Sequence, residues 1–395
     1  MTKKELIPKL RFPEFVNEGE WEKKKLKSFG NFYRGLTYAT DDIADEGLLV
    51  LRSGNIQNET LVLDKDLVFV KKACPDDLIL RHGDIVICMS NGSKVLVGKN
   101  AEYKDEYDGI LTAGAFCSIM RPHNKFAKYF LQTDKYQRFI ALSIGGGNIN
   151  NLKNSDLEEF ECISSENINE QQKIASCLSS LDEVIAAESQ KLDYLKDHKK
   201  GLMQNLFPQE GKKVPKYRFK EFEKDGEWVK NELSDFCFNI SSGKDKNHES
   251  GEFELYGSTG IIGKTESPSY RGNFILVARV GANAGLLNRA KGDFGVTDNT
   301  LVLDLKKVNS IDFIYYNLEK IGLNKLVFGS GQPLITGGQL KSLILFTPKS
   351  DKEQQKIASC LSSLDELITA QIEKIEQFKL HKKGLMQGLF PKMND

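Results

Sequence analysis

Two segments of the chain, residues 171–208 and 354–391, carry apolar side chains at steps of three and four residues. The steps continue over about four heptads, which is typical of a coiled-coil seam rather than the broader apolar face of a globular helix. The pattern therefore predicts two long helices of about 36 residues, each roughly 55 Å long.

Both predicted seams are interrupted at matching positions, by Glu188 or Gln371 and by Lys199 or Lys382. Polar residues in a seam can fix register, orientation or partner choice, or they can mark frayed turns that face solvent. The residues that we expect to serve helix pairing and docking are Ile174, Leu178, Leu181, Ile185, Leu192, Leu195, Gly201, Leu202, Ile357, Leu361, Leu364, Ile368, Ile375, Phe378, Gly384 and Leu385.

Helix starts are predicted at Asn169 and Ser350, because each precedes Gln or Glu by three residues, the spacing of a capping box. Gly201 and Gly384 lie inside the helical pattern, where glycine costs up to about 1 kcal/mol relative to alanine. Their shared position suggests close backbone approach, either to the other helix or to a partner.

The two helical segments are copies of one another. They align without a gap at an offset of 183 residues, with about 27 of 38 positions identical. A weaker repeat relates residues 8–21 to residues 215–228. The chain order is thus head, helix, head, helix, with predicted domains at 1–168, 169–208, 209–350 and 351–391. Polar residues 209–213 are interpreted as a linker. The simplest closure packs the helices antiparallel and brings Met1 near Asp395.

The segments outside the helices carry short β-like runs broken by Gly and Asn turns, followed in each head by a helical pattern at residues 126–142 or 311–327. Each head is interpreted as an α/β domain of one fold with diverged sequence. The predicted class is α+β, with two heads separated along the chain by two long helices in pseudo-twofold order.

Composition limits the function classes. Lys plus Arg equals Asp plus Glu, 55 each, which argues against a binder driven by overall charge but not against local basic surfaces. The seven cysteines show no CxxC spacing. We expect a cytoplasmic protein with reduced thiols, because neither a bilayer-spanning run nor a signal-peptide core is found.

The turns of both heads contain residue types that read bases or contact phosphates. Arg and Lys suit guanine and phosphate, Asn and Gln suit adenine, and Gly lets the backbone come close. Polar turns also occur in every β-rich domain, so each residue has an ordinary structural interpretation as well. The candidates are Arg52, Ser53, Asn55, Asn91, Ser93, Lys94, Ser242, Lys244, Lys246, Tyr256, Ser258, Arg279, Asn283 and Gln332.

The chain has no phosphate-binding loop, no nucleophile elbow, no zinc-binding helix motif and no tetrapeptide of the amino-methyltransferases. The histidines lie far apart, so we expect no catalytic residue and no metal site.

The helix start EQQKIAS, the helix end HKKGLMQ-x-LFP and the runs ILVARVGANAGLLN and VTDNTLVL resemble specificity subunits of type I restriction–modification enzymes. The resemblance covers the whole chain. It implies that each head reads half of a bipartite DNA site, while the helices set the spacing and dock two methyltransferase subunits. It also implies motor–nuclease partners, and places S-adenosylmethionine, ATP and Mg on the partners rather than on this chain.

A helix of fixed length can act as a ruler, because one turn of DNA, ~34 Å, fits within its ~55 Å. The competing hypothesis is a non-catalytic coiled-coil adaptor whose heads bind protein or carbohydrate. A third, an enzyme with a new kind of site in the heads, has no constellation of residues behind it.

Overall fold

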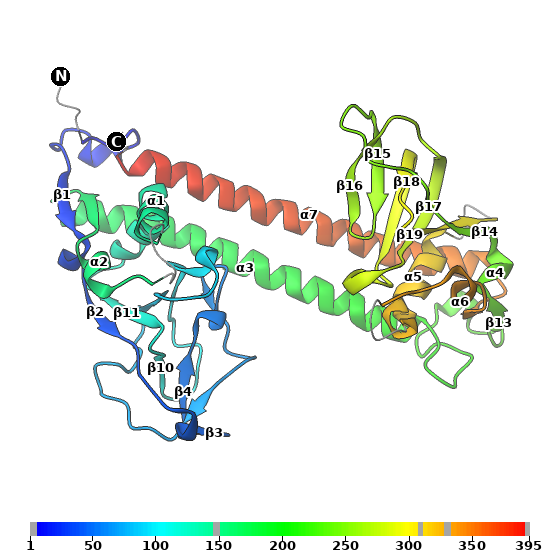
Figure 1. The fold of residues 1–395 in the computed structure, drawn as a ribbon, viewed down its shortest axis with the longest axis horizontal. Coiled ribbons are helices and arrows are strands. Elements are labelled where there is room, and N and C mark those ends of the chain that lie inside the picture. The colour runs from blue at the N-terminus through cyan, green and yellow to red at the C-terminus, as the bar shows by residue number, and fades with distance from the viewer. Residues whose placement is uncertain (1–5, 145–150, 307–310, 328–332, 392–395) are drawn as a thin grey trace. The chain divides into compact units, whose positions relative to one another are not determined.

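The chain forms two compact units in a computed structural model that describes residues 6–144, 151–306, 311–327 and 333–391 (Figure 1). Unit 1 contains residues 1–186 and 376–395, and unit 2 contains residues 187–375. Each unit therefore includes one head and a half of each long helix, whereas the predicted domain boundaries set each helix apart.

The two long helices predicted from the apolar steps are present as α3 (Ile168–Leu206) and α7 (Asp351–Leu389). The predicted cap of α3 at Asn169 is wrong, because Asn167 Oδ1 accepts the hydrogen bond from Asn169 N at 3.0 Å. The start of α7 directly follows Ser350 as predicted. The Glu353 carboxylate, however, binds Arg218 rather than closing a capping box.

Unit 1 contains two four-stranded sheets and two short strand pairs, with the strand orders β10-β4-β7-β3, β2-β11-β8-β9, β1-β12 and β5-β6. The elements are β1 (Glu22–Lys25), β2 (Gly30–Arg34), β3 (Ile43–Ala44), β4 (Leu48–Leu51), β5 (Ile56–Gln57), β6 (Thr60–Leu61), β7 (Phe69–Val70), β8 (Ile85–Cys88), β9 (Asn100–Glu102), β10 (Leu111–Ala113), β11 (Cys117–Pro122), α1 (Asp134–Ser143), α2 (Asn154–Glu158) and β12 (Glu161–Ser164).

Unit 2 contains one six-stranded sheet, in the order β14-β19-β17-β18-β15-β16, and the pair β13-β20. The elements are β13 (Val229–Glu232), α4 (Leu233–Phe236), β14 (Cys237–Ser242), β15 (Phe253–Gly257), β16 (Gly260–Thr265), β17 (Tyr270–Ala278), β18 (Leu287–Val296), β19 (Thr300–Leu305), α5 (Ile311–Ile321), α6 (Gly337–Lys341) and β20 (Ile344–Thr347).

The two heads share one fold, as predicted. Strands β2, β11, β8 and β9 of unit 1 pair in the same order and sense as β14, β19, β17 and β18 of unit 2. The parallel pair β10-β4 and the antiparallel pair β4-β7 then repeat β18-β15 and β15-β16. Unit 1 differs because its sheet is interrupted between β9 and β10, where β18 is continuous.

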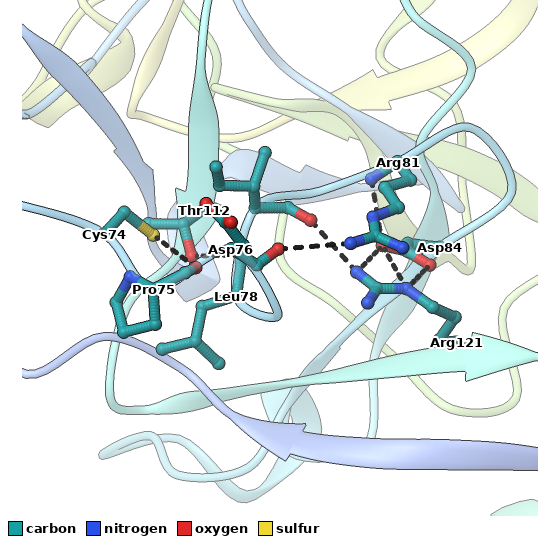
Figure 2. A network of polar contacts seen from close by, with 9 residues as sticks. Cys74, Pro75, Asp76, Leu78, Arg81, Asp84, Thr112 and Arg121 are labelled. Atoms are coloured by element: carbon teal, nitrogen blue, oxygen red, sulfur yellow. Dashed lines mark hydrogen bonds and ion pairs between the residues drawn. The ribbon is translucent and has the colours of Figure 1, made fainter.

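Two insertions account for most of the greater length of the first head. Residues 52–68 replace the turn between β15 and β16, and residues 71–84 replace the turn between β16 and β17. Figure 2 shows how the second insertion is fastened: Arg121 of β11 makes an ion pair of 2.7 Å with Asp84, which is 2% exposed. Asp84 also accepts from Arg81 N, and Thr112 Oγ1 donates to Leu78 O at 2.6 Å. The insertion is thus held by buried polar contacts.

The end of each long helix is packed by the same aromatic set. In unit 1, Phe390 stacks on Phe126 and meets Trp21 edge-on. In unit 2, Phe207 packs in the same way with Phe313 and Trp228. These rings belong to the main cores of the two units.

The segment before each of those tryptophans is fixed to the helix end by one repeated hydrogen bond. Leu10 N donates to Gly388 O, and Tyr217 N donates to Asn205 O, both at 2.9 Å. The chain start therefore lies on the end of α7, as the ring-like closure predicts. Met1 and Asp395 themselves lie outside the described residues.

The helix halves run antiparallel within each unit. In unit 2, Lys199 pairs with Asp365 while Glu188, earlier in α3, accepts a bond from Gln371, later in α7. In unit 1 the first turns of α3 and the last turns of α7 share one core. All the predicted seam Leu, Ile and Phe side chains are buried or half-buried, which agrees with the three–four spacing.

The polar interruptions of the seam are paired and do not form frayed turns. Gln371 Nε2 donates to Glu188 Oε2 at 2.6 Å, and Lys374 pairs with the same carboxylate. Lys382 is 8% exposed and pairs with Asp182 at 2.6 Å, and Lys199 pairs with Asp365 at 2.8 Å. These contacts fix the helix register, because a shifted register would leave buried charges unpaired.

Each head is joined to the long helices through a tyrosine, which binds the aspartate that pairs with the seam lysine of the same unit. Tyr129 donates to Asp182 Oδ2 at 3.1 Å in unit 1, and Tyr316 donates to Asp365 Oδ2 at 2.6 Å in unit 2. Asp182 and Asp365 occupy the same position in the two helix copies. One constant carboxylate thus connects a head, its own helix and the antiparallel helix in each unit.

Candidate nucleic-acid interface

Four loops of unit 2 come together where β18 turns into β19. They are residues 242–246, which begin with the last residue of β14, residues 256–259, which begin in the last two residues of β15, residues 279–283 after β17, and the turn itself at residues 297–299. The backbone joins them to this turn: Thr297 N donates to Tyr256 O, and Arg279 N donates to Asn299 O, both at 2.9 Å. Most of the unit 2 candidates from the sequence therefore lie around one surface.

The approach of the first loop requires glycine. A Cβ on Gly243 would lie 2.0 Å from Val296 O, far inside contact distance. Asp245 continues the contact, because its carboxylate accepts from Val296 N at 2.8 Å. The neighbouring Lys244 and Lys246 are exposed, so this loop presents two cations beside the turn.

The structure separates the unit 2 candidates into exposed and internal residues. Asn283 is exposed like the two lysines, whereas Ser242, Ser258 and Arg279 are half-buried. Tyr256 is 9% exposed and its hydroxyl binds Glu254, so it belongs to the core. Burial raises the pKa of Tyr256. Gln332 lies outside the described residues.

Four buried side-chain atoms of unit 2 have no hydrogen-bond partner within the described part of the chain. They are Arg279 Nε, Asn288 Nδ2, Thr297 Oγ1 and Thr300 Oγ1. Buried polar atoms normally have a partner, because leaving one unpaired costs about 1–3 kcal/mol. Unit 2 therefore holds unused hydrogen-bonding capacity in and beside these loops, which a bound ligand or water can satisfy.

Unit 1 gathers its candidates in the same place. Asn91 Nδ2 donates to Ser53 Oγ at 2.9 Å, which joins the loop after β8 to the loop after β4. Ser93 and Lys94 are exposed on the first loop, and Arg52 is exposed on the second. The surface therefore combines hydroxyl and amide groups with two cations.

Asn55 is the unit 1 candidate that the structure explains differently. It is 2% exposed. Its Oδ1 accepts from Arg52 N at 2.9 Å, and its Nδ2 donates to Val62 O at 3.2 Å. Asn55 thus holds its own loop in shape and does not reach the surface.

The sequence interpretation missed the turn that organises the surface, residues 114–116 in unit 1 and 297–299 in unit 2. The two turns share four backbone hydrogen bonds. With the unit 1 bond given first, the matched bonds are Gly114 N to Leu51 O with Thr297 N to Tyr256 O, Cys117 N to Gly114 O with Thr300 N to Thr297 O, Met89 N to Phe116 O with Arg279 N to Asn299 O, and Gly35 N to Cys117 O with Gly243 N to Thr300 O.

A sequence signal for this turn was present, because the run VTDNTLVL covers residues 296–303 of unit 2. Its counterpart in unit 1, Gly114-Ala115-Phe116, has no polar side chain and therefore gave no signal for base reading. Gly35 supports the turn as Gly243 does, since a Cβ on Gly35 would lie 2.1 Å from Gly114 O.

Gly201 and Gly384 do not serve packing inside the chain. A Cβ at either position would meet no atom within 4 Å among the described residues. The alternative that they allow the two helices to approach closely is therefore wrong. Approach by a partner remains a prediction, as does docking by the seam residues.

Other chemistry is sparse. All seven cysteines are free thiols. In the described ranges no cluster of His, Cys, Asp and Glu could hold a metal ion. A search of the same residues finds no helix that is long and apolar enough to cross a membrane.

Comparison with known families decides the affiliation of the chain. The family model for the type I restriction modification DNA specificity domain matches residues 18–197 and again residues 210–377. The chain belongs to this family. The two matches agree with the two heads and their helices.

Individual members of the specificity family support this affiliation. The specificity subunit of type I restriction enzyme StySPI from Salmonella potsdam is 32% identical over 170 residues, which are 41% of this chain and 36% of that protein. The chain thus spans only about a third of that relative. The putative MjaX specificity subunit from Methanocaldococcus jannaschii is 26% identical over 94% of this chain and 92% of its own length.

A solved structure shows the same fold at full length. The S subunit of a type I restriction–modification system from M. genitalium superposes with a TM-score of 0.63 at 18% identity, covering 98% of this chain and all of that one. The predicted α+β fold with two heads and two long helices is thereby confirmed.

Proposed function

We propose that this chain is the DNA sequence-recognition subunit of a type I restriction–modification complex. Each head reads one half of a bipartite, asymmetric DNA site. The two constant helices set the distance between the half-sites and dock two methyltransferase subunits.

One observation supports this proposal above the others. The two heads bring the same four loops together around equivalent turns through matching backbone hydrogen bonds, yet the side chains on those loops differ between the heads. The helices, in contrast, are nearly identical copies. A constant frame with variable reading loops suits a protein that must recognise two different short sequences at a set interval.

Catalysis is assigned to the partners. We propose that the chain itself carries no catalytic residue and no cofactor. S-adenosylmethionine belongs to the methyltransferase subunits, and ATP with Mg belongs to the motor–nuclease subunits. The neutral net charge fits, because partner subunits can supply part of the phosphate contacts.

The test is a selection from randomised duplex DNA with the chain bound to a modification subunit. A two-part motif with a fixed gap is expected. Absence of any enriched motif would favour the alternative, a coiled-coil adaptor for protein or carbohydrate. Methyl transfer by the chain alone with S-adenosylmethionine would contradict the non-catalytic assignment.

Two altered chains test the division of labour. Exchanging residues 30–161 for the head of another family member should replace one half-site and leave the other unchanged. Inserting one heptad into each helix should change the gap between half-sites. An unchanged gap would show that the helices are not the ruler.

A further inference from the structure

The third residue of the shared turn is Phe116 in unit 1 and Asn299 in unit 2. Phe116 is 70% exposed. Large apolar side chains are often buried, but this one is exposed on a turn that backbone hydrogen bonds join to the loops after β4 and β8. The carbonyl of Phe116 accepts from Met89 N at 2.8 Å and from Ser90 N at 3.2 Å. The turn that carries the exposed ring is therefore anchored by backbone hydrogen bonds.

Folding does not require an aromatic residue at this position. Asn299 is also exposed, and its carbonyl makes the equivalent bond to Arg279 N in unit 2. Because the same backbone turn accommodates either residue, the side chain must serve what differs between the heads. Under the proposed function, that difference is the base sequence read.

The two side chains match two different base edges. In the major groove the thymine methyl is an apolar group, and phenylalanine contacts it favourably. Asparagine instead pairs with the N6 and N7 edge of adenine. Polar side chains are available on the loops that are bonded to this turn: the bonded pair Ser53 and Asn91, and the cation Lys94.

We propose that this turn residue specifies one base pair in each half-site. Phe116 selects thymine through its methyl group, and Asn299 selects adenine through its amide. The inference rests on the proposed function and deepens it, because it assigns the reading of one position to one residue in each head.

The first experiment compares enriched DNA motifs for the wild-type complex, Phe116→Ala, Phe116→Asn and Asn299→Ala, each with the modification subunit. Phe116→Ala should relax one thymine position in a single half-site, and Phe116→Asn should shift that position toward adenine. Asn299→Ala should relax one adenine in the other half-site. Leu142→Ala is the matched control, because Leu142 is 83% exposed in the same unit but lies on α1 and not on one of the four loops.

The second experiment removes the methyl instead of the ring. Replacing the selected thymine with uracil should weaken wild-type binding by about fourfold, the value of one buried methyl group. The same replacement should leave the affinity of Phe116→Ala unchanged. In a Trp228→Phe background, Trp21 fluorescence reports on unit 1 alone and verifies that the Phe116 variant is folded.

The outcomes separate the inference from the function. A two-part motif that Phe116→Ala leaves intact refutes the inference while the proposed function stands. The inference is also refuted if uracil weakens the variant as much as the wild type, or if the variant loses affinity equally for all sequences. If the wild-type complex enriches no motif, the proposed function itself fails.

Discussion

The buried ion pair between Arg218 and Glu353 allows a quantitative test of what holds a head to its helix. Their side chains are 7% and 1% exposed, and the guanidinium binds both carboxylate oxygens at 2.8 Å. Trp228 Nε1 donates to the same carboxylate at 3.3 Å. The substitution Glu353→Gln keeps the shape of the side chain but removes its charge. Arg218 is then left buried, with the Gly226 carbonyl as its remaining strong acceptor.

Breaking a buried pair by removing one partner costs about 3–5 kcal/mol, because the other charge stays desolvated. We take the lower limit, about 3 kcal/mol, since the glutamine amide oxygen can still accept from Arg218. With a urea m value of about 3 kcal/mol per M for a unit of this size, the unfolding midpoint of unit 2 should fall by about 1 M.

The assay uses the two tryptophans of the chain, because Trp21 lies in unit 1 and Trp228 lies in unit 2. In a Trp21→Phe background, urea unfolding followed by fluorescence reports on unit 2 alone. Glu221→Gln is the matched control: its ion pair with Lys356 is about half exposed and should be worth no more than about 1 kcal/mol. The reasoning is refuted if the two substitutions shift the midpoint equally.

Four further predictions concern single contacts. Tyr129→Phe should lower the melting temperature of unit 1, measured by calorimetry, by several degrees, because a hydrogen bond to the Asp182 carboxylate is worth about 1.5–3 kcal/mol. Tyr194→Phe is the control and should have little effect, because Tyr194 lies on an exposed helix face. Gly243→Ala should lower the free energy of unfolding of unit 2 by at least about 1–3 kcal/mol, because the new Cβ would overlap Val296 O. Urea unfolding followed by Trp228 fluorescence measures this. Gly338→Ala is the control, because a Cβ at Gly338 has more space. Gly384→Ala should stabilise the isolated chain by up to about 1 kcal/mol, and should weaken binding of a modification subunit in titration calorimetry only if that partner approaches the bare backbone. The bonds from Gln371 and Lys374 lower the pKa of Glu188, so its carboxylate stabilises the fold at pH values above its ordinary pKa of 4.5, and this contribution is lost as the pH falls through the lowered pKa. Glu188→Gln should therefore flatten the acid side of a plot of melting temperature against pH. An unchanged plot would contradict the assignment.

Much of the architecture could be predicted because it follows from the spacing of apolar residues and from the internal repeat of the sequence. The three–four steps gave both long helices to within a few residues, and the repeat gave the order of heads and helices. The pairing of Lys199 and Lys382 could not be derived, because their partners Asp365 and Asp182 come from the antiparallel helix, and only the structure supplies that register.

Prediction of the candidate DNA-reading surface was less complete, for an identifiable reason. Residue type indicated Lys244, Asn91 and Ser53, which do lie on the loops around the two equivalent turns. It also gave Asn55 and Tyr256, whose polar groups are used internally. It missed Phe116, because an apolar side chain carries no polar signal, and its exposure depends on a turn that forms only when four strands come together.

The repeated bond from the segment before each tryptophan to a helix end has a consequence for chain continuity. Tyr217 reaches Asn205 through a covalent linker, while Leu10 makes the same contact with Gly388 although no peptide bonds join the two ends. The attachment is thus made by local hydrogen bonds and by the aromatic rings beneath it. A protease cut within residues 209–213 should therefore leave both fragments associated. The covalent linker only raises the local concentration of the two segments, while the contacts between them hold them together.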